Sequence, residues 1–590
     1  MNPSENALWV QVNRALVAKN ISELQYEECF APQKTDAGYT LLLHSGVQYQ
    51  FSAWQSLWGQ LRVDATSLLR NGKPVTCGAQ FYVDAQKELE LTDIVLGNLL
   101  EECYQTLHGD IQAWHIKQGV SADQLAQMDI DAMQPYLDGH PKAVLNKGRL
   151  GWGVNELDQY TPETGKPIQL RWIAVRKNRA SVGMSNPSML NSVVASAMSE
   201  DDLALQNKLA KSLGVDSDQW IVMPVHPWQW QHVIQIHYQA WISSGDLVDL
   251  GVRGYRFLPL QSIRTLANVD KPENPNVKLP ITILNTSCYR GIPGKYIEVG
   301  AQLSQWLSDV CERDPLLFDN GAMVLKEPLG VHVAHPVYNQ VQGAPYRYAE
   351  TLGVIWRDSV QARLANNERA MLVAALLQTD NQGNSVIQSL IRESGLTPLA
   401  WMRAYFGAVV VPLYHLLCCY GVGLVAHGQN VTLIVENGVP KRVAIKDLQG
   451  DLRLVDQDFL EMESLPDDIK QVLTRLPAPY LIHDLQTGHF VTVLRYLSAL
   501  MHEQSLLPEQ EFYRALAETL VAYQQDFPQL QTRFAMFDLL TPEIKRVCIN
   551  RVRFKQGYDD SQERPLPTLG TDIANPLVKA MHNQMEESSL

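Results

Sequence analysis

The chain has 590 residues, which is more than one hydrophobic core supports, because single cores stop growing at roughly 250–300 residues; we expect two or three subdomains. Hydrophobic residues make up 46% of the chain and charged residues 19%, a composition that excludes a disordered protein. The formal net charge of −14 argues against a nucleic-acid partner, since phosphate backbones need clustered Lys and Arg. An acidic chain of this kind is more compatible with small-molecule partners.

Compartment signals point to the cytoplasm. The N-terminus, MNPSENALWVQVNRAL, lacks a basic region followed by an apolar run and a cleavage site, so no secretory signal is expected. Eight cysteines are scattered without C-x-x-C or zinc spacing and are expected to be reduced thiols. The apolar run from Tyr405 to Ala426 is about long enough to span a bilayer, but it contains Pro412 and lacks basic flanking loops. We expect a buried core helix there and no membrane association.

Periodicity divides the chain into three parts. Residues 1 to about 130 mix helical spacing with short strand-like runs and indicate an α+β part. From about 140 to 370, β-like runs such as Leu170 to Val175 alternate with proline-rich loops and predict a mixed sheet. The polar stretch Thr379 to Ser385 predicts a boundary, and a mainly helical part follows it. The predicted fold class is α+β.

A glycine- and lysine-rich loop, GHPKAVLNKGRLGWG, spans Gly139 to Gly153. Lys142, Lys147 and Arg149 lie among glycines that allow backbone amides to approach phosphate oxygens closely. The Walker A pattern G-x-x-x-x-G-K-[ST] is absent from this loop, and a solvated turn explains it at least as well when it is considered alone.

A second basic segment, Gln261 to Tyr296, offers side chains that bind phosphate or carboxylate. Arg264 and Arg290 can each hold such a group with two hydrogen bonds. Strand alternation places Lys278 on the face opposite Leu279, away from the apolar side. Surface salt bridges are an equally simple explanation of this segment by itself.

The most informative segment, AHGQNVTLIVENGVPKRVAIKDLQG, starts at Ala426. Two β-branched runs flank Asn437-Gly438, a strong signal for a β-hairpin. Folding the chain at this turn brings Asn430 and Asp447 together at the open end. An amide oxygen beside a carboxylate suits a hard cation such as Mg²⁺, and protein kinases pair an Asn and an Asp in a similar way. The alternative is that the polar residues before the first strand only cap the preceding helix.

Taken in order, the motifs GHP…NKGRLG, VHPWQWQ, SIRT, VKLP…NTSCYRGIPG, AHGQN and KDLQG closely resemble the NRPS-independent siderophore (NIS) synthetases of the IucA/IucC family, over nearly the whole chain. The resemblance implies a cupped hand of thumb (1–138, α+β), fingers (139–378, mixed sheet) and palm (379–590, mainly helical with a kinase-like metal-binding hairpin), and a homodimer. It also implies a ligase that uses ATP and Mg²⁺. A carboxylate gives an acyl-adenylate and pyrophosphate, and an amine then takes the acyl group and releases AMP.

Site residues follow from the same resemblance, motif by motif. Nucleotide binding is implied for His140, Lys147, Ser262, Arg264, Thr265, Lys278, Arg290, Gln429, Asn430 and Asp447. Asn430 and Asp447 lie nearest the metal. The predicted catalytic residues are Arg290, His427 and Lys278, with the first two at the acyl substrate's carboxylate. Many family members carry Glu before the A-H-x-Q-N motif, where this chain has Val425, so a metal or polar role of that position is lost or moved.

The motifs NTSCYRGIPGKY, APYRY, VVVPLYHLLC and YLIHDLQTGHFVTVLR resemble the branch that takes a carboxylate already attached to a hydroxamate arm. That branch contains enzymes that dimerise and cyclise N-hydroxy-N-succinyl diamines into putrebactin-, alcaligin- or bisucaberin-like rings. It also contains aerobactin synthetases, which join N-hydroxy-N-acetyl-lysine to a citryl half-amide. The loop NVDKPENPNVKLP favours the ring makers. Two other classes stay open: a kinase-like phosphotransferase, for which the H-R-D carboxylate is missing, and a non-catalytic binding protein.

Overall fold

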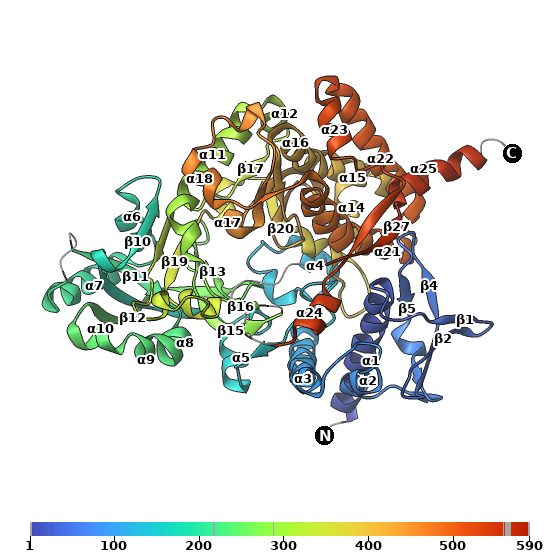
Figure 1. Ribbon diagram of the computed structural model, residues 1–590, viewed down its shortest axis with the longest axis horizontal. Helices are drawn as coiled ribbons and strands as arrows, with labels where there is room; N and C mark the ends of the chain where they lie inside the picture. The colour runs from blue at the N-terminus through green and yellow to red at the C-terminus, as the bar shows by residue number, and fades with distance from the viewer. Residues whose placement is uncertain (1–2, 216–218, 287, 559, 561–567, 588–590) are drawn as a thin grey trace.

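The protein is described from a computed structural model that defines residues 3–215, 219–286, 288–558, 560 and 568–587 (Figure 1). Its buried apolar side chains gather into three large cores, which follow the chain in order. Some residues of the N-terminal part, such as Tyr26 and Trp58, pack instead in the core of the C-terminal part. In Figure 1 the N-terminal part (blue) and the middle part (green) lie on opposite sides of the molecule, and the C-terminal part (orange to red) lies above and between them.

Two long helices and a small sheet build the N-terminal part. Its core runs from Leu8 to Leu145 and takes in Phe554 from the far end of the chain. The sheet is antiparallel with the order β1-β2-β3-β6-β7, and β4 pairs with β5 in a separate hairpin. The elements are α1 (Pro3–Tyr26), α2 (Gly78–Asp84), α3 (Asp93–Ile116), α4 (Ala122–Gln127), β1 (Gln33–Thr35), β2 (Gly38–Leu42), β3 (Gln48–Phe51), β4 (Ala53–Gln55), β5 (Leu61–Val63), β6 (Leu69–Arg70) and β7 (Lys73–Pro74).

An eight-stranded sheet, in the order β10-β18-β19-β14-β13-β12-β9-β11, forms the middle part. All of its pairs are antiparallel, so the predicted mixed sheet is wrong here. Short loops join β12, β13 and β14 in sequence, and short loops connect only antiparallel neighbours. The strands are β9 (Ile168–Arg176), β10 (Ser181–Met184), β11 (Trp220–Val225), β12 (Leu247–Pro259), β13 (Thr265–Asn268), β14 (Asn276–Lys278), β18 (Leu329–His332) and β19 (Gly353–Arg357).

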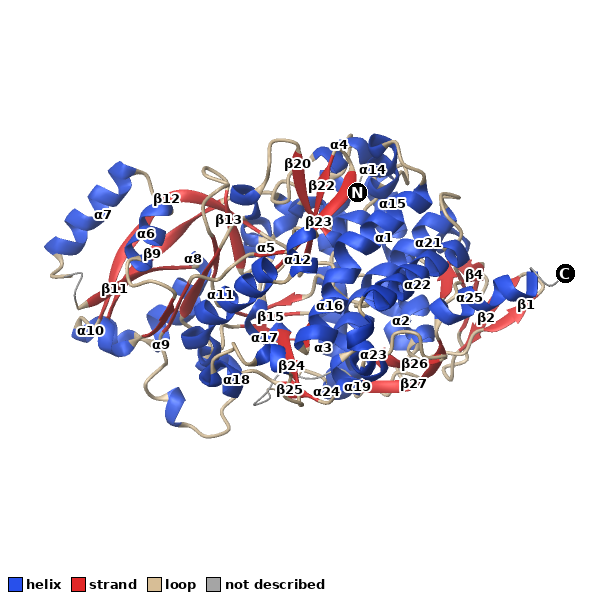
Figure 2. Ribbon diagram, turned by 90° about the horizontal axis from the view of Figure 1, so that it is seen from above, coloured by secondary structure: helices blue, strands red, loops and turns tan. Residues whose placement is uncertain are grey.

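Helices and a smaller sheet complete the middle part. A three-stranded sheet of β8 (Arg149–Leu150), β15 (Ile281–Asn285) and β16 (Cys288–Arg290) follows the order β16-β15-β8. α11 packs against β10 and β18 of the large sheet (Figure 2). The helices are α5 (Val154–Tyr160), α6 (Met189–Ser196), α7 (Glu200–Ser212), α8 (Pro227–Gln229), α9 (Gln235–His237), α10 (Gln239–Ser244), α11 (Ile297–Arg313), α12 (Pro315–Asp319) and α13 (Tyr346–Ala349).

The largest core belongs to the C-terminal part, where helices surround a sheet with the order β17-β23-β22-β20. The stretch from Val299 to Leu325, which precedes the predicted boundary at Thr379, packs in this core. Its strands are β17 (Met323–Val324), β20 (Glu368–Leu372), β21 (Val422–Leu424), β22 (Val431–Glu436), β23 (Val439–Ile445), β24 (Leu452–Val455), β25 (Arg475–Leu476), β26 (Glu543–Cys548) and β27 (Thr568–Ala574). Its helices are α14 (Val386–Ser394), α15 (Pro398–Tyr405), α16 (Val411–Tyr420), α17 (Leu448–Asp451), α18 (Asp467–Val472), α19 (Ala478–Leu481), α20 (His483–Leu485), α21 (Arg495–Glu503), α22 (Glu509–Asp526), α23 (Gln531–Met536), α24 (Asn550–Gln556) and α25 (Pro576–Glu587).

The apolar segment suspected from its length lies inside this core. It runs from Pro398 to Tyr420 as α15, a π-helical turn and α16, and 78% of its most apolar window is buried. This burial is what a core helix shows, in agreement with the prediction. All eight cysteines are free thiols, as expected from their spacing.

A buried ionic network joins the parts of the molecule. Glu27, just past the end of α1, accepts hydrogen bonds from Lys142 Nζ (2.6 Å) and from the backbone N–H of Asn550 at the start of α24 (3.0 Å). Glu23, one turn earlier, accepts a hydrogen bond from Arg495 of α21 (2.8 Å). The four charged side chains are fully buried or nearly so. Buried charges persist only when they are paired and hydrogen-bonded. The end of α1, the loop that carries Lys142, α21 and α24 therefore have to assemble together.

Glu27→Ala should lower the free energy of unfolding by about 3–5 kcal/mol, because it leaves the buried Lys142 ammonium without its hydrogen-bonded partner. Urea unfolding followed by circular dichroism measures the change. The control is Glu518→Ala, which removes an exposed carboxylate paired with Arg403 and should cost less than about 1 kcal/mol. Equal losses in the two variants would contradict a structural role for the network.

Candidate active site

The predicted hairpin is confirmed. β22 and β23 pair antiparallel, and Asn437 (φ 52°) and Gly438 (φ 77°) both adopt the left-handed backbone that a type I′ turn requires. A Cβ atom at residue 438 would lie 2.8 Å from the carbonyl oxygen of Leu390, so only glycine fits there. The last pair of the ladder is Val431 with Ile445. Asn430 and Asp447 therefore lie just beyond it, at the open end.

Asp447 holds two cations of the eight-stranded sheet. Its carboxylate oxygens lie 2.9 Å from Lys278 Nζ and 2.9 Å from a guanidinium nitrogen of Arg357. Lys278 ends β14 and Arg357 ends β19, and these strands pair antiparallel. Burial raises the pKa of Asp447, but Arg357, Lys278 and Lys446 outweigh burial and hold the pKa well below its usual value. An ionised Asp447 thus fixes the open end of the hairpin against the sheet.

Asn430 contacts a second carboxylate, Asp451. Its side-chain nitrogen donates to Asp451 Oδ2 (3.0 Å) and to the carbonyl oxygen of Val425 (3.1 Å). Both N–H groups are used in this way, and the side-chain oxygen remains available as an acceptor or ligand. An amide oxygen and two carboxylates, Asp447 and Asp451, are the donor types that Mg²⁺ prefers. The residues present therefore fit a magnesium ion.

Two histidines from distant segments meet beside these carboxylates. The ring centroids of His140 and His427 are 6.3 Å apart, edge to face. His140 Nδ1 accepts the backbone N–H of Ala143 and His427 Nδ1 accepts that of Gln429, each at 3.2 Å. Burial, with smaller effects of His427 and nearby cations, lowers the pKa of His140 to about 3, and burial also lowers the pKa of His427. Both rings are neutral at pH 7, and each keeps its proton on Nε2 as a hydrogen-bond donor.

The SIRT segment reaches the end of β16 through Arg264. Its side chain donates a hydrogen bond to the carbonyl oxygen of Gly291, the residue after Arg290. Ser262 accepts the backbone N–H of Thr265 (3.2 Å), and Thr265 pairs with Lys278 across β13 and β14. Ser262, Thr265 and Lys278 thus lie around the pairing of two central strands of the sheet.

The guanidinium of Arg290 has one hydrogen-bond donor that is unpaired within the described residues. Its Nη2 donates to the carbonyl oxygen of Asn285 (2.9 Å) and to the hydroxyl of Thr286 (2.6 Å). Its Nε is buried and has no hydrogen-bond partner within the described residues. Buried donors normally have an acceptor, so this atom is suited to an anionic ligand.

The loop from Gly139 to Gly153 differs from the predicted phosphate cradle. Lys147 Nζ lies 2.6 Å from Asp110 Oδ1 and 3.0 Å from the carbonyl oxygen of Asp138, and the side chain is 1% exposed. Lys142 and Arg149 are also buried in ion pairs. These cations already have their counter-charges, so a contact between Lys147 and a phosphate would require its ion pair to open.

A π-helical segment, Gln486–Leu494, supports the AHGQN motif from behind. A Cβ atom at Gly488 would lie 2.9 Å from the backbone nitrogen of Ala426, and His489 Nδ1 hydrogen-bonds the carbonyl oxygen of Ala426 (2.9 Å). His489 Nε2 meets the hydroxyl of Tyr405 (3.0 Å). Both ring nitrogens are therefore used to place the residue before His427.

Comparisons with known proteins show the family of the chain. Residues 129–378 match the family model described as "IucA / IucC family", and residues 399–562 match the one described as "Ferric iron reductase FhuF-like transporter". The chain is 42% identical over 570 residues to the aerobactin synthase of Escherichia coli, covering 96% of this chain and 98% of that protein. The chain belongs to the IucA/IucC family. The resemblance seen in its motifs is thereby confirmed.

One further relative and two solved structures are similar to this chain over nearly its whole length. A putrebactin synthase from Shewanella sp. is 29% identical over 584 residues, covering 96% of this chain and 91% of that protein. The structure of aerobactin synthetase IucC from Klebsiella pneumoniae superposes with a TM-score of 0.88 at 40% identity, covering 98% of this chain and all of that chain. The ATP-bound aerobactin synthetase IucA from Klebsiella pneumoniae shares the fold, with a TM-score of 0.76 at 16% identity, covering 96% of this chain and 99% of that chain.

Arg357, Lys446 and Asp451 were not among the residues predicted from the family motifs. Arg357 belongs to no motif and reaches the site only through the pairing of β19 with β14, which one sequence does not reveal. Lys446 is buried beside Arg357, and burial followed by the Arg357 charge lowers its pKa to about 7. Asp451 follows the KDLQG motif directly, so its position after a short turn is the signal that identifies it.

His140→Gln should flatten the acid side of the stability profile. Because burial depresses the pKa of His140 to about 3, the unfolded chain binds a proton below about pH 6.5 that the folded chain refuses. The wild-type protein then loses about 1.4 kcal/mol per pH unit at this residue between about pH 6 and pH 4, and the variant does not. Urea unfolding at pH 7.5, 6.0 and 5.0 measures the difference. An unchanged slope would contradict a buried neutral His140, and the offset between the proteins above pH 7 serves as the internal control.

Proposed function

We propose that this IucA/IucC family member is an ATP- and Mg²⁺-dependent ligase of hydroxamate siderophore biosynthesis, which activates a carboxylate as an acyl-adenylate and joins it to an amine. The observation that carries the proposal is the junction of Lys278, Arg357 and Asp447, where cations from the sheet meet the open end of the hairpin. Relatives named as synthases or ligases support an enzyme of the ligase type.

Each side of the junction has a distinct task in this proposal. Bound ATP would supply the activating group for the carboxylate. Arg264 and Lys278 would bind its phosphates from the sheet, together with Ser262, Thr265 and Gln429. The Nε2–H groups of His140 and His427 would donate to the same anion without adding charge. Arg290, through its buried Nε, would orient the substrate carboxylate toward the reacting phosphorus.

The metal would be held by Asn430, Asp447 and Asp451. Asp451 hydrogen-bonds Asn430 and lies against the backbone of Val425, where many family members have Glu. We propose that Asp451 supplies the carboxylate that this chain lacks at position 425. Asp447 would hold the metal, and its present partners Lys278 and Arg357 would be available to the phosphates, where they would stabilise developing charge.

The acyl substrate is proposed from the relatives. Identity to the aerobactin synthase is 42% and identity to the putrebactin synthase is 29%, so the aerobactin-type alternative is favoured over the ring makers. The substrates would then be a citryl half-amide and N-hydroxy-N-acetyl-lysine. The homodimer and the cytoplasmic location remain predictions alongside this proposal.

Asp447→Asn should reduce AMP formation at least about 100-fold, because it removes a charged metal ligand and the counter-charge of two cations from the site. The midpoint of thermal unfolding should also fall, because Lys278 and Arg357 lose their charged partner. Asp451→Asn is the matched comparison: it should raise the Mg²⁺ concentration needed for half-maximal rate and keep Asp447 in its ion pairs. A folded Asp447→Asn protein with wild-type AMP production would refute the metal assignment.

Product analysis should distinguish the substrate classes. With ATP, Mg²⁺, N-hydroxy-N-acetyl-lysine and a citryl half-amide, we expect AMP, pyrophosphate and the condensed product by mass spectrometry. Turnover of N-hydroxy-N-succinyl-cadaverine or its putrescine homologue into a dehydrated dimer would instead establish the ring-making alternative. ADP formation would indicate a phosphotransferase, and the absence of any nucleotide turnover would reject the ligase.

A further inference from the structure

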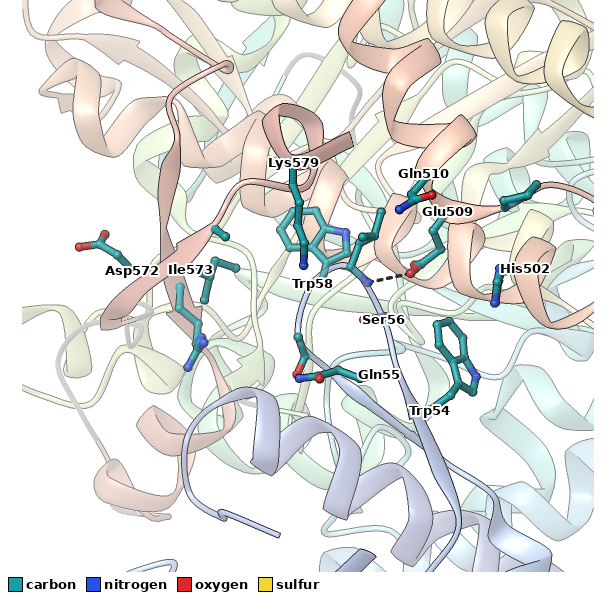
Figure 3. Close-up of a pocket in the computed structure, with 15 residues that line it drawn as sticks. Trp54, Gln55, Ser56, Trp58, His502, Glu509, Gln510, Asp572, Ile573 and Lys579 are labelled. Atoms are coloured by element: carbon teal, nitrogen blue, oxygen red, sulfur yellow. Dashed lines mark hydrogen bonds between the residues drawn. The ribbon is translucent and has the colours of Figure 1, made fainter. Parts of the chain in front are cut away.

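A cavity lies away from the candidate active site, where the N-terminal part meets the end of the chain. Its volume is about 500 Å³, within the roughly 300–1,000 Å³ typical of small-molecule sites. Three segments line it: the β4–β5 hairpin, the ends of α21 and α22 that face each other, and β26, β27 and α25 (Figure 3). None of the predicted nucleotide or metal residues lines it.

Part of the cavity wall is aromatic and aliphatic, and the rest is formed by polar side chains such as Gln55 and Gln510. Trp54 and Trp58 come from the hairpin, and the Trp54 indole lies 4.8 Å from the His502 ring. Pro508 and Ile573 complete the apolar lining. Such walls favour a ligand with a planar or apolar body, because aromatic faces contribute contact area at little cost in conformational entropy.

Two buried hydrogen-bond donors of the lining lack acceptors, and an exposed lysine accompanies them. Lys579 of α25 is exposed to solvent and extends into the cavity in Figure 3, and no ion pair to it is found in the described part of the chain. The Ser56 hydroxyl is buried, with the residue 4% exposed, and has no hydrogen-bond partner in the described structure. Arg546 gives one nitrogen to Glu28 (2.6 Å), while its Nε is buried and has no such partner. Buried polar groups normally have partners, so these donors call for an acceptor.

The acidic side chains of the lining do not supply that acceptor. Glu509 accepts the backbone N–H of Leu57 (2.7 Å) with one oxygen and the Ser498 hydroxyl (2.9 Å) with the other. Asp572 pairs with Lys545 (2.8 Å), and Figure 3 shows it directed away from the centre of the cavity. Lys579 is therefore the cation of the lining that has no ion-pair partner among the described residues, and its ammonium is open to solvent.

We propose that this cavity binds a small organic monocarboxylate with a planar or apolar body. A single carboxylate matches the single uncompensated cation, and its two oxygens can accept from Lys579 and from Ser56 or Arg546 Nε. An inorganic phosphate matches neither the apolar walls nor the single charge. The proposal is independent of the reaction assigned to the active site, because it uses different residues.

Isothermal titration calorimetry of the full-length protein at pH 7 tests this site with indole-3-acetate as the probe. Its neutral isostere, indole-3-acetamide, measures the contribution of the body alone. We expect the acetate to bind at least about 10-fold more tightly than the amide, and Lys579→Met to abolish this difference by weakening only the acetate. Ser56→Ala should weaken the acetate several-fold. Lys211→Met, which removes an exposed ammonium on α7 that does not line the cavity, is the matched control and should leave both affinities unchanged.

Each outcome decides the proposal. Equal affinities for acetate and amide, or no binding of the acetate, would overturn it. Equal effects of Lys579→Met and Lys211→Met would show nonspecific attraction and would overturn it as well. Binding of inorganic phosphate that depends on Lys579 would reject the carboxylate class. Thermal unfolding midpoints of the variants within about 2 °C of wild type show that the losses do not come from misfolding. AMP formation by Lys579→Met should equal that of the wild type, which separates this site from the proposed ligase activity.

Discussion

The Glu27–Lys142 ion pair is the contact on which the arrangement of this protein depends. It binds the end of the first helix to the loop that carries His140 and to the start of α24, all without solvent. His140 lies two residues before Lys142, so the same pair that closes the N-terminal part also determines where the imidazole meets His427. Breaking a buried ion pair lowers the free energy of unfolding far more than breaking an exposed one, because water cannot solvate the charge that remains. Position in the site and stability of the fold are thus two results of one interaction.

The site itself is balanced by its own carboxylate. Lys278 and Arg357 are buried cations that would be costly alone, and Asp447 pairs with both and offsets one of their two charges. In the proposed function, an anionic ligand and its metal would exchange partners with groups that are already dehydrated and in place. Preorganised charges of this kind stabilise developing charge better than water does, because they need little rearrangement. The buried Nε of Arg290 and the Nε2–H groups of the two histidines would add further fixed hydrogen-bond donors.

Local features of this fold could be predicted from the sequence, and non-local ones could not. The Asn437-Gly438 turn specifies a hairpin by backbone conformation alone, and the apolar run at Tyr405 specifies a core helix by composition. The contribution of Arg357 depends on which strands are neighbours in a sheet, a long-range property that no local pattern contains. Lys147 is a second long-range case. Its glycine-rich surroundings predicted a contact with phosphate or a solvated turn, whereas the side chain is buried and paired with Asp110 of α3, a partner that the local sequence does not reveal.

The π-helical segment behind the AHGQN motif limits how the family can change over evolutionary time. Gly488 and His489 reach Ala426 only because the wide turn sets their phase relative to the rest of the helix. A substitution elsewhere in Gln486–Leu494 alters one side chain, whereas an insertion or deletion of one residue rotates all later positions by about 100° about the helix axis. That rotation would carry His489 away from the motif it supports. We therefore expect the segment to tolerate changes of composition but not of length, and we expect alignment gaps to avoid it even between distant homologues.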